Sequence, residues 1–274
     1  LRARVAGRLT RWFAMGEWSA GLDGGHRRSI PDQAGADGRV DTDVLTLAAD
    51  ADAVQVRAHL HAGATGESPQ LRMLAVCTGP DAAPAVGGDA FIEGWGADLD
   101  VPERTQRVAG SNLWGGGDAW CSPASVSMVM AYWAARCGRP AWAVDVATAA
   151  AGIFDPVYGG CGNWPFSVAF AAEHGMRGYV ARMPGLPDIE RRIAAGAPVI
   201  ASIRAAPGEL RGAPYAQTEG HLLVVRGFTP QGGVVCNDPY AGEGSIRRVY
   251  DRAEFARAWL TGSRGAVYLL EPPL

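Results

Sequence analysis

The stretch Trp120–Trp133, WCSPASVSMVMAYW, decides which fold this chain adopts. Pro123 suits the first turn of a helix and Ser122 is a good N-cap, so we expect a helix over Pro123–Arg136. Cys121 then lies at the amino-terminal end of this helix, where the helix dipole and free N–H groups favour a thiolate. Because the thiolate is the nucleophilic form, the segment predicts a reactive cysteine; a buried structural cysteine is the alternative.

A histidine and an acidic residue lie on two apolar stretches further along the chain. His221 opens GHLLVVRGF, where Gly220 leaves room beside it, and Asp238 ends VVCND. We expect both stretches to be strands, joined by a turn at 229–232. Antiparallel pairing then brings His221 and Asp238 to the same edge of one sheet. With Cys121 on a facing helix tip, this arrangement predicts a nucleophile, a base and an orienting carboxylate.

Other residues near these positions are candidates for binding the substrate or stabilising charge. Gln106 precedes Cys121 on the loop that enters the helix, and its amide NH₂ is a candidate oxyanion donor; a solvated loop glutamine is the alternative. Asn163 and Trp164, in the Gly-rich GCGNWPF, either form a wall of the cleft or serve as helix cap and core residue. The predicted substrate-binding set is Trp120, Asn163, Trp164 and Gly220.

Composition excludes several classes of function. The 274 residues carry 25 basic and 28 acidic side chains, a net charge of −3, which gives no sign of nucleic-acid binding. Every basic residue is arginine, and the absence of lysine excludes P-loop and pyridoxal Schiff-base chemistry. No apolar run approaches the ~20 residues of a membrane span. We expect no cofactor and no metal, because the His59 and His61 pair has no acidic or cysteine partner nearby in the sequence.

The five cysteines form an odd set without C-x-x-C spacing, which argues against a zinc ribbon or a thioredoxin-like motif. Cys137 and Cys161 both fall at the ends of elements around the predicted helix, and we expect them to form a disulfide if the protein is secreted. Cys77 and Cys236 are expected to be buried thiols on strands.

The chain divides into two regions of different character. In residues 1–85, short runs rich in Val, Leu and Thr alternate with Gly, Asp and Pro clusters, which predicts an all-β, sandwich-like domain. In residues 86–274, helices precede antiparallel strands, an α+β pattern. The strands expected in the first region are Val5–Phe13, Thr42–Leu47, Val54–Leu60 and Leu71–Val76. The further helices expected in the second are Trp142–Ala151, Phe166–His174, Ile189–Ala195 and Ala253–Leu260, and its further strands are Pro198–Ile203, Arg247–Tyr250 and Ala266–Leu270.

The order of these motifs resembles cysteine peptidase family thirty-nine, a papain-like group, and in particular its stand-alone, usually secreted bacterial members with an N-terminal β domain. The segments that carry the resemblance are VPERTQ, WCSPASVSMVMAYW, GNWPFSVAFA, GHLLVVRGF, NDPYA and VYDRAEFARAWL, with GEWSAGLD and GRVDTDVLTL near the start. The resemblance implies a papain-like domain with Cys121 as nucleophile, His221 as general base, Asp238 as orienting acid and Gln106 as oxyanion donor. Asn237 is the alternative to Asp238, since papain-like enzymes can use asparagine in that role.

We therefore expect a cysteine peptidase or amidase, secreted or at the cell surface, that hydrolyses a peptide or amide bond in a peptide or protein substrate. The chain begins Leu-Arg-Ala-Arg and not with Met, so we expect that N-terminal residues have been removed, which allows for a lost targeting segment. Two alternatives remain open. One is a catalytically silent papain-like module that binds a peptide or glycan, with a cell-surface polymer held by the β domain. The other is an acyltransferase that uses the same triad.

Overall fold

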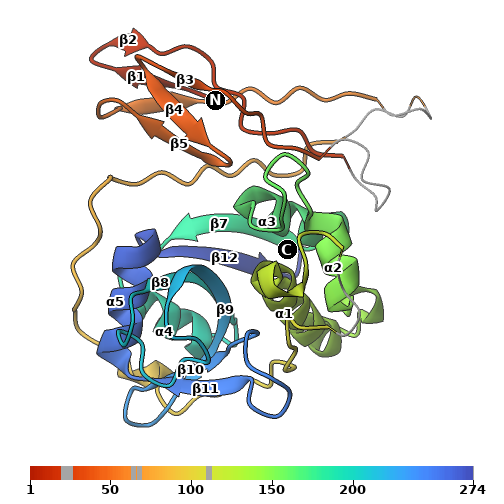
Figure 1. Cartoon of the computed structure of the whole chain (residues 1–274), viewed down its shortest axis with the longest axis vertical. Coiled ribbons are helices and arrows are strands. Elements are labelled where there is room, and N and C mark those ends of the chain that lie inside the picture. Colours follow the sequence, from red (N-terminus) through yellow and green to blue (C-terminus); the bar gives the residue numbers. More distant parts are fainter. Residues whose placement is uncertain (20–26, 63–65, 67–69, 109–112, 274) are drawn as a thin grey trace.

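The computed structural model describes residues 1–19, 27–62, 66, 70–108 and 113–273. Its largest part is a six-stranded antiparallel sheet with helices packed around it (Figure 1). In spatial order the strands are β11 (Arg247–Tyr250), β10 (Val234–Asn237), β9 (Thr218–Phe228), β8 (Val199–Ala205), β12 (Ala266–Glu271) and β7 (Arg177–Arg182). The helices are α1 (Cys121–Cys137), α2 (Val146–Ile153), α3 (Trp164–Glu173), α4 (Leu186–Ala194) and α5 (Arg252–Ser263). Short 3₁₀ turns lie at Ile92–Gly94, Gly117–Ala119 and Pro140–Trp142.

Helices cover both faces of this sheet, which explains why the sequence of β9 is a continuous apolar run. Leu222 and Val224 pack into the core formed with α1, α2 and α3, whereas Leu223 and Val225 pack into the core formed with α4 and α5. Side chains alternate across a strand, so a strand buried on both faces needs apolar residues at every position. Figure 1 shows α1 and α2 on one side of the sheet and α5 on the other.

The predicted α+β organisation of this part is confirmed, and each helix and strand predicted there is present, all but Arg247–Tyr250 with shifted ends. Two details differ. The predicted N-cap Ser122 lies inside α1, because the helix starts at Cys121, and the N-cap Trp120 makes no side-chain capping bond. The strand β7 was not predicted: arginine stands at both ends of its sequence, RGYVAR, and most of its residues are only half-buried.

The N-terminal region forms two small three-stranded sheets, which confirms that it is built from strands. One contains β1 (Arg2–Val5), β2 (Arg8–Leu9) and β6 (Ala53–Gln55), and the other contains β3 (Ala34–Gly35), β4 (Gly38–Asp41) and β5 (Val44–Leu47). The predicted strand over Leu71–Val76 is wrong: its residues are exposed and pair with no neighbouring strand, so alternating apolar residues there reflect no buried face. The sandwich arrangement and the boundary at residues 85 and 86 stay predictions.

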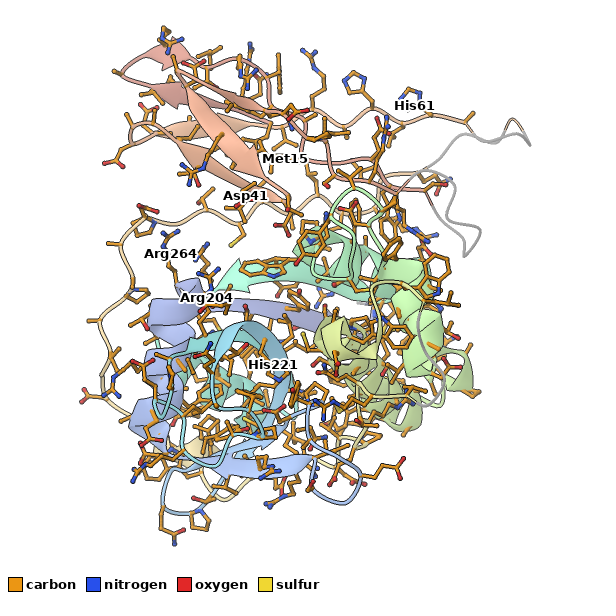
Figure 2. All side chains as sticks on the ribbon, viewed as in Figure 1. Met15, Asp41, His61, Arg204, His221 and Arg264 are labelled. Carbon is orange, nitrogen blue, oxygen red and sulfur yellow. The ribbon has the colours of Figure 1, made fainter. Side chains whose placement is uncertain are left out.

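The N-terminal region contacts the helical side of the domain through the turn between β4 and β5. Asp43 in this turn accepts a hydrogen bond of 2.6 Å from the backbone N–H of Trp164, the first residue of α3. Thr42 beside it has a φ of 55°, a backbone conformation that β-branched residues rarely adopt. Figure 2 shows the neighbouring Asp41 at the edge of the N-terminal sheets that faces the helices.

This contact has a consequence for stability. Burial raises the pKa of Asp43 to about 6, against the opposing effect of the Trp164 N–H bond. A carboxyl whose pKa is raised by folding binds a proton more tightly in the native state than in the unfolded chain. The free energy of unfolding contributed by Asp43 therefore falls as the pH rises from about 4 to about 6 and stays low above that. At about 1.4 kcal/mol per pKa unit, the cost at neutral pH is at most about 3 kcal/mol.

We predict that Asp43→Asn, which keeps an oxygen acceptor for Trp164 without the charge, raises Tm relative to the wild type at pH 8. The difference should shrink toward pH 4, where the wild-type carboxyl is protonated. Thermal unfolding followed by circular dichroism at both pH values measures this, with Asp41→Asn on the same turn, an exposed position, as the matched control. An Asp43→Asn variant with the wild-type Tm at pH 8 would contradict the prediction.

Candidate active site

The nucleophile candidate is held at the first turn of α1. Cys121 is half-buried and begins the helix. One turn along, the Ser125 hydroxyl donates a 3.2 Å hydrogen bond to the backbone carbonyl of Leu222 on β9. Because Leu222 directly follows His221, this bond fixes the start of α1 beside the part of β9 that carries the histidine.

The antiparallel pairing of β9 with β10 brings the histidine and the acid together, as the sequence predicted. His221 Nε2 lies 2.8 Å from Asp238 Oδ1, and their side chains are 5% and 0% exposed. The imidazole of His221 lowers the pKa of the Cys121 thiol, so the thiol lies within electrostatic reach of the same ring. Since the carboxylate occupies Nε2, Nδ1 is the ring nitrogen left for a second partner. Figure 2 shows His221 in the interior of the domain.

The pKa values of the three groups are coupled. Burial raises the pKa of Cys121, but the hydrogen bond and the charge of His221 lower it more, so that it lies below the ordinary thiol value. Burial lowers the pKa of His221, but the charge and hydrogen bond of Asp238, together with Cys121, raise it to about 10. Between these two pKa values the site holds a thiolate beside an imidazolium, which is the reactive form of a cysteine nucleophile.

Tyrosines that the sequence analysis missed surround the acid. The hydroxyls of Tyr215 and Tyr250 donate to Asp238 Oδ2 at 3.0 and 2.7 Å, and the backbone N–H of Tyr240 donates to Oδ1 at 3.1 Å. Burial raises the pKa of Asp238, yet His221 and these donors lower it below its ordinary value. The ring of Tyr215 also packs edge-on against the His221 ring, with centroids 5.0 Å apart. Tyr240, in NDPY, is close to the acid in sequence, whereas no local pattern marks Tyr215 or Tyr250.

Asn237 points away from the histidine. Its amide NH₂ donates to the carbonyl of Val101 at 3.0 Å, and its oxygen accepts from Arg226 at 3.2 Å. Neighbouring residues at the end of β10 present their side chains to opposite sides. Asp238, and not Asn237, is therefore the residue that contacts His221.

Gln106 lies close to the nucleophile, but its amide is already engaged. Its backbone N–H donates to the carbonyl of Pro239 at 2.8 Å, which places it beside the acid. Its side-chain NH₂ donates to the carbonyls of Gly117 and Asp118, at 3.2 and 2.6 Å, on the segment that leads into Cys121. In this conformation Gln106 holds that segment, so one amide hydrogen would have to be released before it could bind an oxyanion.

Two of the predicted substrate-binding residues are not available to a substrate. Trp120 is 1% exposed and packs in the core, with its Nε1–H donating to the carbonyl of Trp114 at 3.0 Å. Asn163 is fully buried and caps α3, accepting from the backbone N–H of Phe166 at 3.2 Å. The prediction that these two residues contact substrate is therefore wrong, because helix and core packing occupy them.

The other two predicted substrate-binding residues, Trp164 and Gly220, are at least partly exposed to solvent. Trp164 is half-buried and packs edge-on against Tyr268. Gly220 is exposed, and a side chain there would meet no atom within 4 Å. Their role in binding stays a prediction.

Tyr158, in the loop between α2 and α3, is a further candidate that the sequence analysis missed. Its side chain is 52% exposed and covers Gly162, where an added Cβ would lie 2.7 Å from the tyrosine hydroxyl. Burial raises the pKa of Tyr158, and the negative charges of Cys121 and Asp43 raise it further, so the hydroxyl lies within electrostatic reach of both. An aromatic residue in the Gly-rich run VYGGCG was the signal in the sequence.

The predicted Cys137–Cys161 disulfide is wrong. All five cysteines are free; Cys137 is exposed at the carboxyl end of α1, whereas Cys161 is buried near Cys121 at the other end. The 17 residues of α1 separate its ends by about 24 Å at 1.5 Å per residue, far beyond disulfide range. Cys236 is buried on β10 as predicted, but Cys77 is exposed and lies outside any strand.

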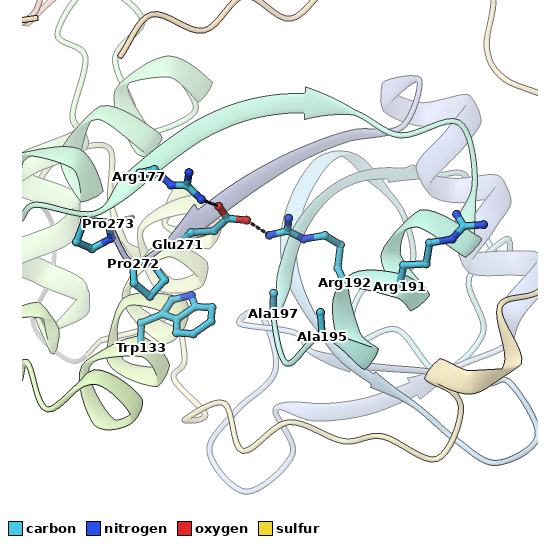
Figure 3. Close-up of a pocket in the computed structure, with 9 residues that line it drawn as sticks. All are labelled: Trp133, Arg177, Arg191, Arg192, Ala195, Ala197, Glu271, Pro272 and Pro273. Carbon is cyan, nitrogen blue, oxygen red and sulfur yellow. Dashed lines mark hydrogen bonds and ion pairs between the residues drawn. The ribbon is translucent and has the colours of Figure 1, made fainter. Parts of the chain in front are cut away.

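Other possible sites lie apart from this one. Within the described ranges, no three His, Cys, Asp or Glu side chains gather as metal ligands, and His59 and His61 stack at 6.5 Å in an exposed segment. An open pocket at the far end of α1 is lined by Trp133 and arginines (Figure 3). Its Arg177 and Arg192 both donate to Glu271. No helix in the described part is long and apolar enough to cross a membrane.

A helix that carries a cysteine at its first turn, packed on an antiparallel sheet that carries the histidine, defines a papain-like cysteine peptidase domain. Residues 98–267 match the Peptidase_C39 like family, and residues 1–79 match the Peptidase C39 N-terminal domain. The chain therefore belongs to the peptidase C39-like family.

Solved structures with some similarity include three peptidases. One is a double glycine motif protease from an AMS/PCAT transporter in complex with the leader peptide (19% identity, 65% of this chain and 95% of that chain, TM-score 0.42). A second is a Bacillus anthracis protein described as a C39-like peptidase (16%, 65% and 99%, TM-score 0.45). The third is xylellain, a cysteine protease from Xylella fastidiosa (9%, 73% and 100%, TM-score 0.36). A search of the curated proteins found no match.

The coupled pKa values predict how Cys121 reacts with iodoacetamide. Because the thiolate forms at a pH below the ordinary thiol pKa, the alkylation rate of Cys121 should fall less steeply between pH 8 and pH 6 than that of a free thiol. A free small-molecule thiol in the same buffers should slow about a hundredfold over that range, tenfold for each pH unit below its pKa near 8.5. Mass mapping of the labelled residue against time measures the rate.

His221→Ala is the matched variant for this measurement, because it removes both the hydrogen bond and the positive charge. We expect its Cys121 to follow the free thiol in pH dependence. Wild-type Cys121 that slows with falling pH as steeply as the free thiol would count against the ion pair.

Proposed function

We propose that this protein is a cysteine peptidase or amidase that hydrolyses a peptide or amide bond through Cys121, His221 and Asp238. The observation that carries the proposal is the buried contact between His221 and Asp238 together with the pKa of Cys121, which His221 lowers at the start of α1. Membership of the peptidase C39-like family supports a peptide or protein as the substrate. No step of the proposed reaction requires a cofactor.

The first half of the reaction forms an acyl-enzyme. The Cys121 sulfur attacks the carbonyl carbon, a C–S bond forms, and the carbonyl electron pair moves to oxygen. His221, protonated at Nδ1, gives its proton to the leaving amine as the C–N bond breaks. Asp238 stays ionised and holds the imidazole in place through Nε2.

The second half of the reaction releases the carboxylic acid product. His221 accepts a proton from water, the oxygen attacks the thioester carbon, and the C–S bond breaks to regenerate the thiolate and imidazolium pair. The proposed oxyanion donors in both halves are the backbone N–H of Cys121 at the start of α1 and the Gln106 amide, once it releases Gly117 or Asp118.

We also propose that the protein acts outside the cell or at its surface. The resemblance of its motifs to the secreted, stand-alone members of the family supports this location. An antibody against the native protein, applied to fractionated cultures of the source organism, would locate it; recovery only from the cytoplasmic fraction would contradict the proposal.

The first test of the proposed function is covalent labelling with a peptide-like epoxysuccinyl inhibitor, followed by mass mapping. We expect a single adduct on Cys121 in the wild type. Under the same conditions, none of the five cysteines of the His221→Ala variant should be labelled. The same protein should cleave members of a peptide library, and Cys121→Ala should cleave none. A folded wild type that is neither labelled nor active would contradict the proposal and favour a silent binding module.

Adding an amine acceptor to the library assay separates hydrolysis from acyl transfer. Hydrolysis releases the free acid whether or not the amine is present, whereas an acyltransferase yields the amide of the acceptor as its main product. Mass spectrometry of the products reads out both. Amide as the main product at low acceptor concentration would contradict the hydrolase assignment while leaving the triad in place.

Tyr250→Phe tests the positioning of the acid. The variant removes a hydroxyl that donates to Asp238 at 2.7 Å, and hydrogen bonds to charged groups contribute about 1.5–3 kcal/mol. We expect kcat to fall about tenfold or more with KM nearly unchanged, because Tyr250 is 1% exposed and cannot touch the substrate. Tyr215→Phe removes the second, longer bond and should cost less. An unchanged kcat in Tyr250→Phe would show that His221 does not depend on this donor.

A further inference from the structure

The loop between α2 and α3 packs against the segment that leads into Cys121, where a Cβ on Gly115 would lie 3.2 Å from the carbonyl of Gly159. A buried carboxylate holds this loop in place. Asp155 is fully buried, and its side chain accepts hydrogen bonds from the backbone N–H groups of Val157 and Tyr158 at 3.0 and 3.3 Å. It also accepts from the Asn163 amide at 3.1 Å, which closes the loop onto the cap of α3. The exposed ring of Tyr158 is thereby held on the surface of this loop, within electrostatic reach of the Cys121 sulfur.

The N-terminal region supplies a further donor to this same carboxylate. The backbone N–H of Ser29 lies 3.2 and 3.1 Å from the two Asp155 oxygens, in a contact buried from solvent. The ring of Trp18 packs against Phe166 on the first turns of α3, with centroids 5.2 Å apart. Asp43, which accepts a hydrogen bond from the Trp164 N–H, is a third contact. Three separate parts of the N-terminal region, at Trp18, Ser29 and Asp43, therefore contact the loop or the start of α3.

A short path connects these contacts to the nucleophile. Ser167 on α3 is hydrogen-bonded through its hydroxyl to Ser122 at 2.8 Å and to the carbonyl of Asn163 at 3.1 Å. Ser122 directly follows Cys121 and also donates to the Tyr268 hydroxyl at 3.3 Å. The residues that the N-terminal region holds are thus packed directly against the residues that carry the thiol.

The N-terminal region has little core of its own. Among its described residues, Ala3 and Phe13 are the hydrophobic side chains that are buried, whereas the contacts with α3 and its loop bury polar groups such as Ser29. A module that only tethers the enzyme needs no buried polar contacts to the wall of the site. The placement of these contacts indicates that the two regions are coupled.

We propose that the N-terminal region is a positioning element of the active site: Asp43 and Ser29 hold the start of α3 and its loop so that Tyr158 and Trp164 form a wall for the substrate peptide beside Cys121. This inference rests on the proposed peptidase function. It assigns the N-terminal region a part in substrate recognition, which is separable from the reactivity of the thiol.

Two reagents distinguish recognition from reactivity in the full-length chain. Iodoacetamide is small and reports the thiolate alone, whereas a peptide-like epoxysuccinyl inhibitor must also occupy the cleft. Asp43→Ala removes the acceptor for Trp164, Asp43→Asn keeps an oxygen acceptor, and the exposed Asp41→Asn is the matched control on the same turn. Rates are measured at a temperature at least ten degrees below the Tm of each variant.

We expect Asp43→Ala to lose at least about tenfold in the second-order rate with the epoxysuccinyl inhibitor, through weaker reversible binding, and to stay within about threefold of wild type with iodoacetamide. Asp43→Asn should recover most of the inhibitor rate, and Asp41→Asn should match the wild type. Equal inhibitor rates in Asp43→Ala and wild type would overturn the inference. A parallel loss with both reagents would also overturn it, because Asp43 would then only support the fold.

Tyr158→Ala tests the wall independently of the N-terminal contact, at an exposed side chain whose removal should not affect folding. We expect the same selective loss of the inhibitor rate, with the neighbouring exposed Val157→Ala as the matched control. Loss in Val157→Ala but not in Tyr158→Ala would overturn the inference. Failure of the wild type to react with either reagent would instead refute the proposed function.

Discussion

The hydrogen bond between His221 and Asp238 is the interaction on which the site depends. An ionised carboxylate with no exposed surface is costly unless hydrogen bonds replace its lost water. Asp238 obtains them from β9 through His221, from β11 through Tyr250, from the loop after β8 through Tyr215, and from its own turn through Tyr240. The register of β9, β10 and β11 and the position of the imidazole are therefore tied to the same group, and a shift of β9 or β11 would remove one of the hydrogen bonds that offset the burial of its charge.

The thiol depends on a second constraint, the packing of α1 on one face of the sheet. Ser125 bonds to the β9 backbone next to His221, and Ser122 bonds to both α3 and β12. Because these polar contacts are buried in an otherwise apolar core, they fix the rotation of the helix as well as its distance from the sheet. The His221 imidazole can then lower the pKa of Cys121 despite its burial. The N-terminal region acts on the same packing from outside, through the first turn of α3 and the loop before it.

Much of the site could be predicted because its parts lie on strong local patterns. His221 is on β9 and Asp238 directly follows β10, and the two apolar strands are joined by a short turn, so pairing brings the two residues together. Cys121 begins a helix that the sequence marks with a proline in its first turn. The failures have equally physical causes. The Cys137–Cys161 pair was inferred from element ends, but chain position does not reveal that the two residues lie at opposite ends of α1. Alternation over 71–76 predicted a strand, although nothing covers those side chains.

By itself the sequence determined the α+β class, the helix that has Cys121 at its amino-terminal end, and the paired strands that bring His221 and Asp238 together, since each follows from residues a few positions apart. Only the tertiary structure decided that Asn237 turns away from the histidine and that the Gln106 amide holds the segment before Cys121. It also decided that two tyrosine hydroxyls donate hydrogen bonds to the carboxylate of Asp238. It also brought Ser29 to Asp155, across 126 positions of the chain. Local periodicity says which face of an element is buried, but the partner of a buried polar group is chosen by packing among distant elements, and no short pattern records that choice.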